Sequence, residues 1–218
     1  MTYSGDVKVG GPADARELRG LTIHKLAVGP MDNNAYLLVD GSSGEGLLID
    51  AANEAERLLQ LVGDVPLATV VTTHRHGDHW QALAAVTAAT GARTVAHPLD
   101  APELPVPVAA TVGHGDTVSV GSSTLSVVHL RGHTPGSIAL AYEDPADGVV
   151  HLFTGDSLFP GGPGRTTSPE DFTSLMDDLE ARVFGVFGDD TWFYPGHGND
   201  STLGAERPSV PEWRSRGW

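Results

Sequence analysis

The chain contains no cysteine, so neither a disulfide nor a thiolate metal ligand is available to it. Positive charge is also scarce, because 13 Lys and Arg residues stand against 28 Asp and Glu residues, a formal net charge of −15. Nucleic-acid phosphates require a basic surface, so this composition argues against a nucleic-acid partner. No stretch approaches the roughly 20 consecutive apolar residues that span a bilayer, and we expect no membrane partner.

The rest of the composition is typical of a globular protein. Hydrophobic residues make up 40% of the 218 positions, enough for a buried core, and we expect residues 1–218 to form one domain. The first six residues lack the basic and then apolar layout of a secretory signal, so we expect a cytoplasmic protein. The sequence predicts no particular oligomeric state.

The densest group of polar side chains is the segment His74-Arg75-His76-Gly77-Asp78-His79, which directly follows an apolar run. Imidazole and carboxylate are preferred ligands of zinc and iron. Alternate residues on an extended backbone point the same way, so His74 and His76 can bind one ion while Asp78 and His79 face a second. A metal requires neutral imidazole, so clustered histidines that would repel each other as cations are compatible once metallated. Two ions need further ligands from elsewhere in the chain.

Three downstream segments repeat the same order of strand, small residue, ligand-type residue and loop. They place His133, Asp156 and His197 after strand-like runs. The four strand ends reinforce one another as candidates for a single metal centre. Isolated histidines are more often surface or hydrogen-bonded core residues, and we expect this of His24, His97 and His151.

Turn signals and hydrophobic periodicity predict a mixed α/β protein. We expect strands at 21–28, 35–39, 46–49, 67–72, 93–96, 117–120, 125–129, 137–142, 149–153 and 192–194. The proline-rich segment 98–107 is expected to be a loop over one edge. Strands followed by a helix in each half of the chain indicate two packed sheets with helices outside.

Three helices are expected from their capping residues. Asn53 is the expected cap of a helix that runs through Val62 and ends at Gly63. A second helix is expected from Trp80 to Thr90. A third begins after Ser168, with proline next and acids in its first turn, and its apolar stripe is expected to face the core. That stripe consists of Phe172, Leu175, Met176, Leu179 and Val183.

Taken in order, these motifs resemble the metallo-β-lactamase superfamily, and within it the glyoxalase II-like hydrolases. The resemblance runs from about Asn33 to Pro208 and rests on the segments 73–79, 132–137, 154–156, 164–166 and 194–198. It implies a four-layer αββα sandwich with metals at one end between the sheets. The complete absence of cysteine excludes the β-lactamase subclasses that use a thiolate ligand.

The resemblance also implies a ligand set for two divalent ions, zinc in the first place, with iron or manganese as alternatives. One ion would be held by His74, His76 and His133, the other by Asp78, His79 and His197, with Asp156 bridging both. Divalent metal lowers the pKa of bound water from about 15.7 toward about 7, which produces hydroxide at neutral pH. Such a centre hydrolyses esters, thioesters, amides or phosphoesters.

Asp78 and Asp156 are the expected catalytic carboxylates. Asp78 can ligate a metal while it orients the attacking hydroxide, and Asp156 would bridge the two ions. Asp50, at the end of a short apolar strand, is either an acceptor for the free N–H of a ligand histidine or a turn residue.

The resemblance favours a small acyl-thioester as substrate. The loop 159–166 is similar to the glyoxalase II loop in which a cation reaches the substrate, and Arg165 takes that place. An arginine fork suits a carboxylate, although Arg165 could instead tie down its own loop. Glyoxalase II carries a helical C-terminal extension that holds glutathione, whereas this chain ends 21 residues after His197 and has Gly198-Asn199 in place of an aromatic residue. The thiol carrier is therefore left open.

Several other functions compete with thioester hydrolysis. A persulfide dioxygenase would hold one iron through His74, His133 and Asp156. A β-lactamase is disfavoured by the bridging carboxylate, a nuclease by the acidic charge, and a flavin-linked diiron oxidoreductase by His76, where glutamate is usual, and by chain length. Another ester or lactone hydrolase and a non-catalytic metal-binding protein are the remaining alternatives.

Overall fold

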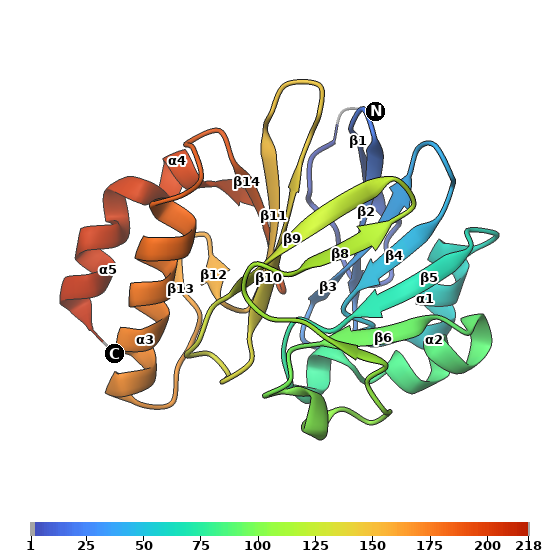
Figure 1. Ribbon diagram of the computed structural model, residues 1–218, viewed down its shortest axis with the longest axis horizontal. Helices are drawn as coiled ribbons and strands as arrows, with labels where there is room; N and C mark the ends of the chain where they lie inside the picture. Colours follow the sequence, from blue (N-terminus) through green and yellow to red (C-terminus); the bar gives the residue numbers. More distant parts are fainter. Residues whose placement is uncertain (1–2, 218) are drawn as a thin grey trace.

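Two β-sheets face each other in the computed structural model, which describes residues 3–217, and helices cover both outer faces (Figure 1). The first sheet has seven strands in chain order: β1 (Asp14–Glu17), β2 (Leu21–Val28), β3 (Asn33–Asp40), β4 (Gly46–Ile49), β5 (Leu67–Val71), β6 (Arg93–Ala96) and β7 (Ala110–Thr111). Neighbours from β1 to β4 are antiparallel, and those from β4 to β7 are parallel. The helices α1 (Ala55–Val62) and α2 (Leu83–Thr90) make the first two parallel crossovers and lie on the outer face.

The second sheet has six strands and its own outer helices. Its order is β15 (Ser201–Thr202), β14 (Trp192–Pro195), β11 (Val150–Gly155), β10 (Ile138–Glu143), β9 (Ser123–His129) and β8 (Thr117–Val120). Only β11 and β14 pair in parallel. The covering helices are α3 (Pro169–Leu179), α4 (Leu203–Glu206) and α5 (Val210–Arg216), and a small hairpin joins β12 (Leu158–Phe159) to β13 (Gly162–Pro163).

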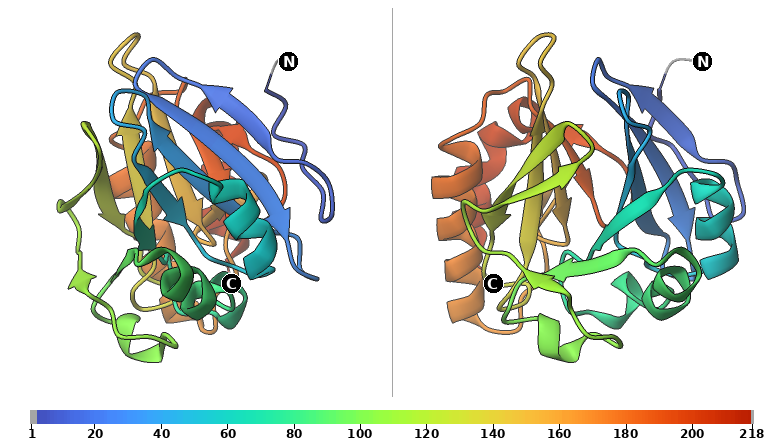
Figure 2. Two further views of the ribbon diagram at one scale, coloured as in Figure 1. Left: turned by 90° about the vertical axis from the view of Figure 1, so that its right-hand side faces the viewer. Right: turned by 45° about the vertical axis from the view of Figure 1, so that its right-hand side comes forward.

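Three apolar cores separate the four layers. The layers can be followed in the right-hand view of Figure 2. Successive residues of a strand point to opposite faces. In β5, Val71 therefore packs between the sheets while Val70 packs under α1 and α2. In β14, Tyr194 packs between the sheets while Phe193 packs under α3. The predicted αββα sandwich is confirmed.

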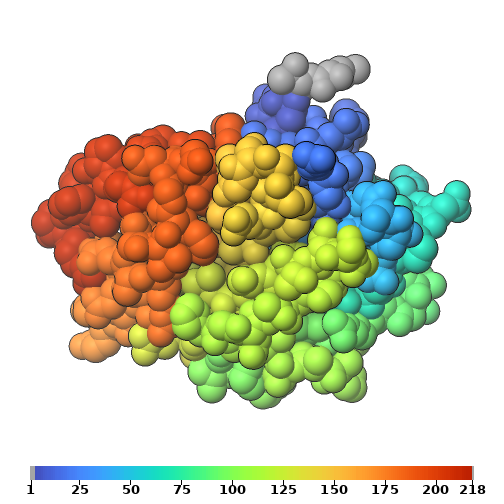
Figure 3. Space-filling view, turned by 45° about the horizontal axis from the view of Figure 1, so that its top comes forward, coloured from blue at the N-terminus to red at the C-terminus, as the bar shows by residue number. Residues whose placement is uncertain are grey.

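The turn between β10 and β11 lies at one end of the sandwich, beside the N-terminal strands. Figure 3 shows this segment, in yellow, between the blue N-terminal strands and the orange to red C-terminal part of the chain. The backbone N–H of Arg19 donates to Asp144 of this turn. None of the helices within residues 3–217 combines the length and hydropathy that a membrane span requires.

The long strands were predicted correctly and the shortest ones were missed. Strands at 21–28, 46–49, 93–96 and 117–120 have the predicted bounds, and the other predicted strands differ by at most two residues at an end. The strands β1, β7, β12, β13 and β15 have only two to four residues, too few for a hydrophobic alternation to show. The segment 98–107 is largely a loop, as expected, with one 3₁₀ turn at Ala101–Glu103.

The third helix starts as predicted, but the first two do not. Ser168 caps α3 through its hydroxyl, and the apolar stripe of α3 is buried. Asn53 is not the cap of α1; Glu54 holds that position with a left-handed backbone, and Asn53 instead bonds to the Glu54 N–H and to Gln81. The second helix begins at Leu83 rather than Trp80, because a 3₁₀ turn at Gly77–His79 precedes it.

Candidate metal centre

The first predicted ligand group is assembled from both halves of the chain. His74 and His76 follow β5, and His133 lies in the loop between β9 and β10. Their ring centroids are 4.5 to 4.9 Å apart, and one nitrogen of each lies within 4.8 Å of the others. These three side chains can therefore share one ion.

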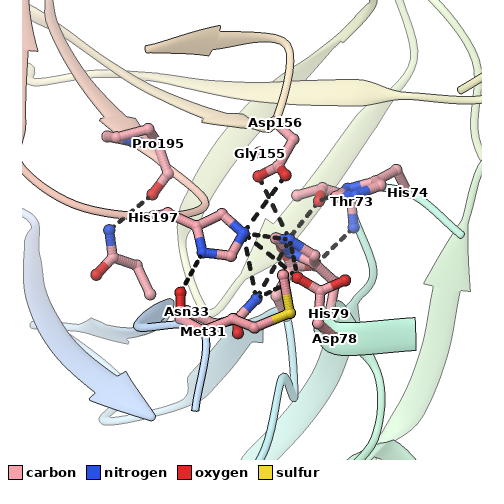
Figure 4. A network of polar contacts seen from close by, with 12 residues as sticks. Met31, Asn33, Thr73, His74, Asp78, His79, Gly155, Asp156, Pro195 and His197 are labelled. Atoms are coloured by element: carbon pink, nitrogen blue, oxygen red, sulfur yellow. Dashed lines mark hydrogen bonds and ion pairs between the residues drawn. The ribbon is translucent and has the colours of Figure 1, made fainter. Parts of the chain in front are cut away.

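The second group lies beside the first, and Figure 4 shows it together with His74 and Asp156. Asp78, His79 and His197 each offer one atom within 4.8 Å of the others. Asp156 follows β11, and its carboxylate lies near histidines of both groups. Its Oδ1 is 3.3 Å from His79 Nε2, and its Oδ2 is 3.4 Å from His197 Nε2 and 3.6 Å from His133 Nε2.

The donor set fits divalent metal ions. Ligand atoms on a tetrahedron with bonds of 2.0–2.1 Å lie about 3.4 Å apart, which is close to the spacing around Asp156. Three atoms of the cluster are buried and have no hydrogen-bond partner among the described residues: His74 Nε2, His133 Nε2 and Asp156 Oδ1. Buried polar atoms are rarely left unpaired, so these three atoms call for a ligand of their own.

Four histidines are oriented by a bond at the other ring nitrogen. Such bonds leave Nε2 free to face a metal and fix the tautomer. The acceptors of the Nδ1–H groups are the Thr73 hydroxyl for His74 (3.0 Å), Asp50 for His79 (2.8 Å), the Arg165 carbonyl for His133 (2.7 Å) and the Met31 carbonyl for His197 (2.8 Å). The rings are therefore held in place by the protein alone.

Asp50 holds two of these histidines from one buried position. It has a left-handed backbone (φ 58°), a conformation that non-glycine residues rarely adopt and that recurs at functional sites. Its carboxylate accepts the Thr73 N–H at 2.7 Å, the Thr73 hydroxyl at 2.8 Å and His79 Nδ1–H. The same hydroxyl accepts from His74, so Asp50 reaches His79 directly and His74 through Thr73.

In the metal-free chain, carboxylates and histidines of the cluster stabilise each other's charges. Burial opposes a proton on His79, but the carboxylates of Asp50 and Asp156 raise its pKa to about 10. Burial also opposes charge on Asp156, but the neighbouring imidazoles of His197 and His79 hold its pKa well below the usual range. Burial lowers the pKa of His74 well below its usual value. A divalent ion would replace the histidine protons as the positive charge that these carboxylates need.

Two glycines lie where any side chain would collide with Asp156. A Cβ at Gly196 would lie 2.1 Å from Asp156 Oδ1 and 2.6 Å from His79 Cε1. A Cβ at Gly164 would lie even closer to the Asp156 carbonyl oxygen. Any larger residue at either position would displace the Asp156 carboxylate or its loop.

Asn33 is part of the cluster and was not predicted. Its Nδ2 donates to Asp78 Oδ2 at 2.8 Å and lies 3.4 Å from Nε2 of both His79 and His197. A backbone bridge also pairs Asn33 with His197. The available signal was a polar pair, Asn33 and Asn34, at the start of an otherwise apolar strand, and both are 1% exposed.

Arg165 lies at the edge of the centre, and the three isolated histidines lie outside it. The Arg165 side chain is exposed and lines a cavity of about 260 Å³ together with Phe172 and Arg216. Neither arginine forms an ion pair with a residue in the range 3–217. His97 and His151 are buried and hydrogen-bonded and His24 is half-buried, as expected of histidines without a metal role.

The metallo-beta-lactamase superfamily model matches residues 28–202, so the chain belongs to this superfamily. A hydroxyacylglutathione hydrolase from Fuscovulum blasticum is 40% identical over 135 residues, which cover 62% of this chain and 51% of that protein. The match therefore spans about half the length of that relative.

Two solved structures are similar over most of the chain. ETHE1 from Myxococcus xanthus has a TM-score of 0.76 and 30% identity, and the match covers 88% of this chain and 84% of that one. A protein described as TTHA1623 in a di-iron-bound form has a TM-score of 0.70 and 32% identity, with 86% and 98% covered. These likenesses agree with the four-layer fold.

Proposed function

We propose that the chain is a dinuclear metallohydrolase that cleaves small acyl-thioesters. The observation that carries this proposal is the convergence of two three-residue ligand groups on one shared carboxylate, Asp156. Divalent ions bound there would supply a Lewis acid for the acyl carbonyl and a water of lowered pKa. Zinc suits the histidine-rich set, and the similarity to a protein in a di-iron-bound form supports iron as an equal alternative.

Side chains and backbone groups of the protein would orient the attacking water and hold the ligand rings in place. Asn33 holds one oxygen of Asp78 at 2.8 Å, which leaves the other carboxylate oxygen to accept a hydrogen bond from the attacking water. Asp50 and the Met31 carbonyl fix the rings of His79 and His197. Preorganised groups of this kind do not have to rearrange during the reaction, which is the main benefit of an electrostatic active site.

The thioester assignment rests on the relatives and on the cavity beside Arg165. The matching curated protein is named a hydroxyacylglutathione hydrolase, although the match covers about half of it. Arg165 and Arg216 line one cavity and have no carboxylate partner within residues 3–217, in a chain with a net charge of −15. Two free guanidinium groups suit a thiol carrier that bears a carboxylate.

The test is metal content followed by turnover. We expect about two divalent ions per chain by elemental analysis and hydrolysis of S-lactoylglutathione faster than of the matched oxygen ester. Asp156→Ala should lose both ions and slow turnover at least 1,000-fold, because it removes the shared ligand. Asp147→Ala, in the exposed turn between β10 and β11, is the matched control. Two bound ions without turnover on thioesters, esters and lactones would instead favour a non-catalytic metal-binding protein.

A persulfide dioxygenase is the second candidate, for one specific reason. Within the ligand cluster, the three buried atoms without partners among the described residues come from two histidines and one carboxylate: His74, His133 and Asp156. This is the composition of a facial triad for a single iron. One iron per chain, with oxygen consumed in the presence of a persulfide, would favour this function over hydrolysis.

A further inference from the structure

Asp100 joins two of the loops that carry candidate metal ligands. It lies between β6 and β7, in the segment predicted to be a loop over one edge, and is 1% exposed. Its Oδ2 accepts the backbone N–H of Arg75 at 3.0 Å and the hydroxyl of Thr134, and its Oδ1 accepts the backbone N–H of Gly136 at 2.9 Å. Both oxygens act only as acceptors, as the oxygens of an ionised carboxylate do.

The residues that Asp100 holds are the sequence neighbours of one ligand group. Arg75 lies between His74 and His76, and Thr134 follows His133. These three histidines form the first group, and they come from two loops that are far apart in the sequence. Asp100 therefore connects the two loops across the gap that an ion in this group would span.

The packing around Asp100 leaves it little freedom to move. A Cβ at Gly136 would lie 2.7 Å from Asp100 Cγ and 2.9 Å from its backbone nitrogen, so the loop after His133 is in direct contact with this residue. The Thr134 hydroxyl also lies 2.7 Å from Ser137 Oγ, which fixes the rotamer that points at Asp100. No cation pairs with Asp100 within residues 3–217, so these hydrogen bonds alone compensate its burial.

We infer that Asp100 is a positioning residue for the ion held by His74, His76 and His133. It sets the separation of the two loops, so the affinity of this group for a divalent ion depends on it. The group formed by Asp78, His79 and His197 has its own supports in Asn33, Asp50 and Met31 and does not depend on Asp100. The inference rests on the metal centre of the proposed function but is independent of the substrate.

The test compares two buried aspartates at opposite ends of the molecule. Asp100→Asn replaces one acceptor oxygen with an NH₂ that must face a donor. Asp40→Asn is the matched control, because Asp40 is also 1% exposed and also accepts backbone N–H groups and hydroxyls, but lies at the end of β3 opposite Asn33. The measurements are calorimetric titration of the metal-free chains with Zn²⁺ and the absorption spectrum with Co²⁺.

We expect Asp100→Asn to weaken one of the two binding steps by 10- to 100-fold, the range seen when partners of metal ligands are removed, and to leave the other within about threefold. The Co²⁺ spectrum should lose the component of one site. Both variants should lower the melting temperature of the metal-free chain, and Asp40→Asn should leave both binding steps unchanged. Thr134→Val, which removes one donor at nearly constant volume, should weaken the same step by a smaller factor, and Thr134→Ser should restore it.

Equal weakening of both steps in Asp100→Asn, or no weakening of either, would show a purely structural residue and overturn the inference. In that case the wild-type chain would still bind two ions, so the proposed function would stand. A wild-type chain that binds no ion would overturn both.

Discussion

His151 shows how a buried histidine outside the metal centre is kept neutral. It lies on β11, is 3% exposed, and its Nδ1 accepts the hydroxyl of Tyr194 at 2.7 Å, while that hydroxyl accepts from Arg16. Burial and the nearby Arg16 charge lower the pKa of His151 to about 4. Its environment therefore does the opposite of that of His79, whose pKa two carboxylates raise.

The depressed pKa of His151 predicts a pH-dependent stability. The unfolded chain protonates this histidine near pH 6.5 but the folded chain does so only near pH 4, so stability is complete above about pH 6.5 and is lost as the pH falls toward 4. His151→Asn keeps an acceptor for Tyr194 and removes the titration. We expect the free energy of unfolding, from urea denaturation of the metal-free chains, to drop by about 2 kcal/mol more in wild type than in the variant between pH 7 and pH 4.5. Equal drops would contradict the assignment.

The close contacts of Gly196 predict that one added methyl group will disturb the candidate metal centre. In Gly196→Ala, the new Cβ overlaps Asp156 Oδ1 and His79, so the shared carboxylate must move. We expect at least 100-fold lower turnover and weaker binding of both ions, measured by steady-state kinetics and metal titration. Gly113→Ala is the control, because its Cβ meets nothing nearer than 3.8 Å and its backbone is ordinary. Full activity in Gly196→Ala would mean that Asp156 does not occupy the shared position.

At the scale of elements, α3 supports the loop of one ligand from behind. Asp178 on α3 accepts the backbone N–H of Arg131 at 2.9 Å and also binds the Arg131 guanidinium. Arg131 lies two residues before His133, and Gly132 packs directly against α3. The helix that covers the second sheet thus also supports the loop that carries His133.

The cap of α3 gives a prediction for this element. The Ser168 hydroxyl accepts the Asp171 N–H at 3.0 Å, one of the first-turn donors that a helix cannot satisfy itself. We expect Ser168→Ala to lower the free energy of unfolding by about 1 kcal/mol, measured by chemical denaturation, and Ser168→Asp to recover most of it. If Ser168→Asp is as unstable as Ser168→Ala, the cap is not the cause.

The elements that could be predicted are those whose signals are local. The strand ends with His74, His133, Asp156 and His197 each combine an apolar run with adjacent turn residues. Asn33 and Asp100 could not be found this way, because their partners Asp78 and Thr134 are 45 and 34 residues away in the sequence. The surroundings of Arg165 could not be predicted either, because Arg216, which lines the same cavity, is distant from it in the sequence.

The predicted start of α1 was wrong for a different reason. Asn53 has the composition of a cap, but Gly29 N–H bonds to the Glu54 carboxylate and Asn53 bonds across to Gln81. These tertiary contacts stabilise a left-handed Glu54 and move the helix start by one residue. Local propensity cannot anticipate such a change.

At the scale of the whole molecule, the candidate metal centre lies where the two sheets are joined. Besides the candidate ligand side chains, Asn34 N–H donates to the Gly196 carbonyl at 2.7 Å, and Tyr36 donates to the Pro195 carbonyl at 2.6 Å. These bonds fasten the end of β14 to β3 across the sandwich. An ion bound at this edge would link residues of the two sheets as well.

Removal of metal should therefore destabilise the entire fold. An ion present at 100 times its dissociation constant stabilises the folded chain by about 2.7 kcal/mol, which for a chain of this size is worth about 5–10 °C in melting temperature. We expect a chelator to lower the melting temperature by at least that amount, and added Zn²⁺ to restore it, in differential scanning calorimetry. Asp156→Ala should show little response to either. An unchanged melting temperature after complete removal of metal would contradict this role.

Each ligand group draws on both halves of the polypeptide, and the boundary between those halves lies where β7 ends at Thr111 and β8 begins at Thr117. A chain cut there would yield two fragments, each with one sheet and its outer helices, and neither with a complete coordination set. Reassociation of such fragments would bury the apolar core between the sheets again, and divalent cations would strengthen it. The architecture therefore contains the parts of a genetically encodable, two-component metal sensor.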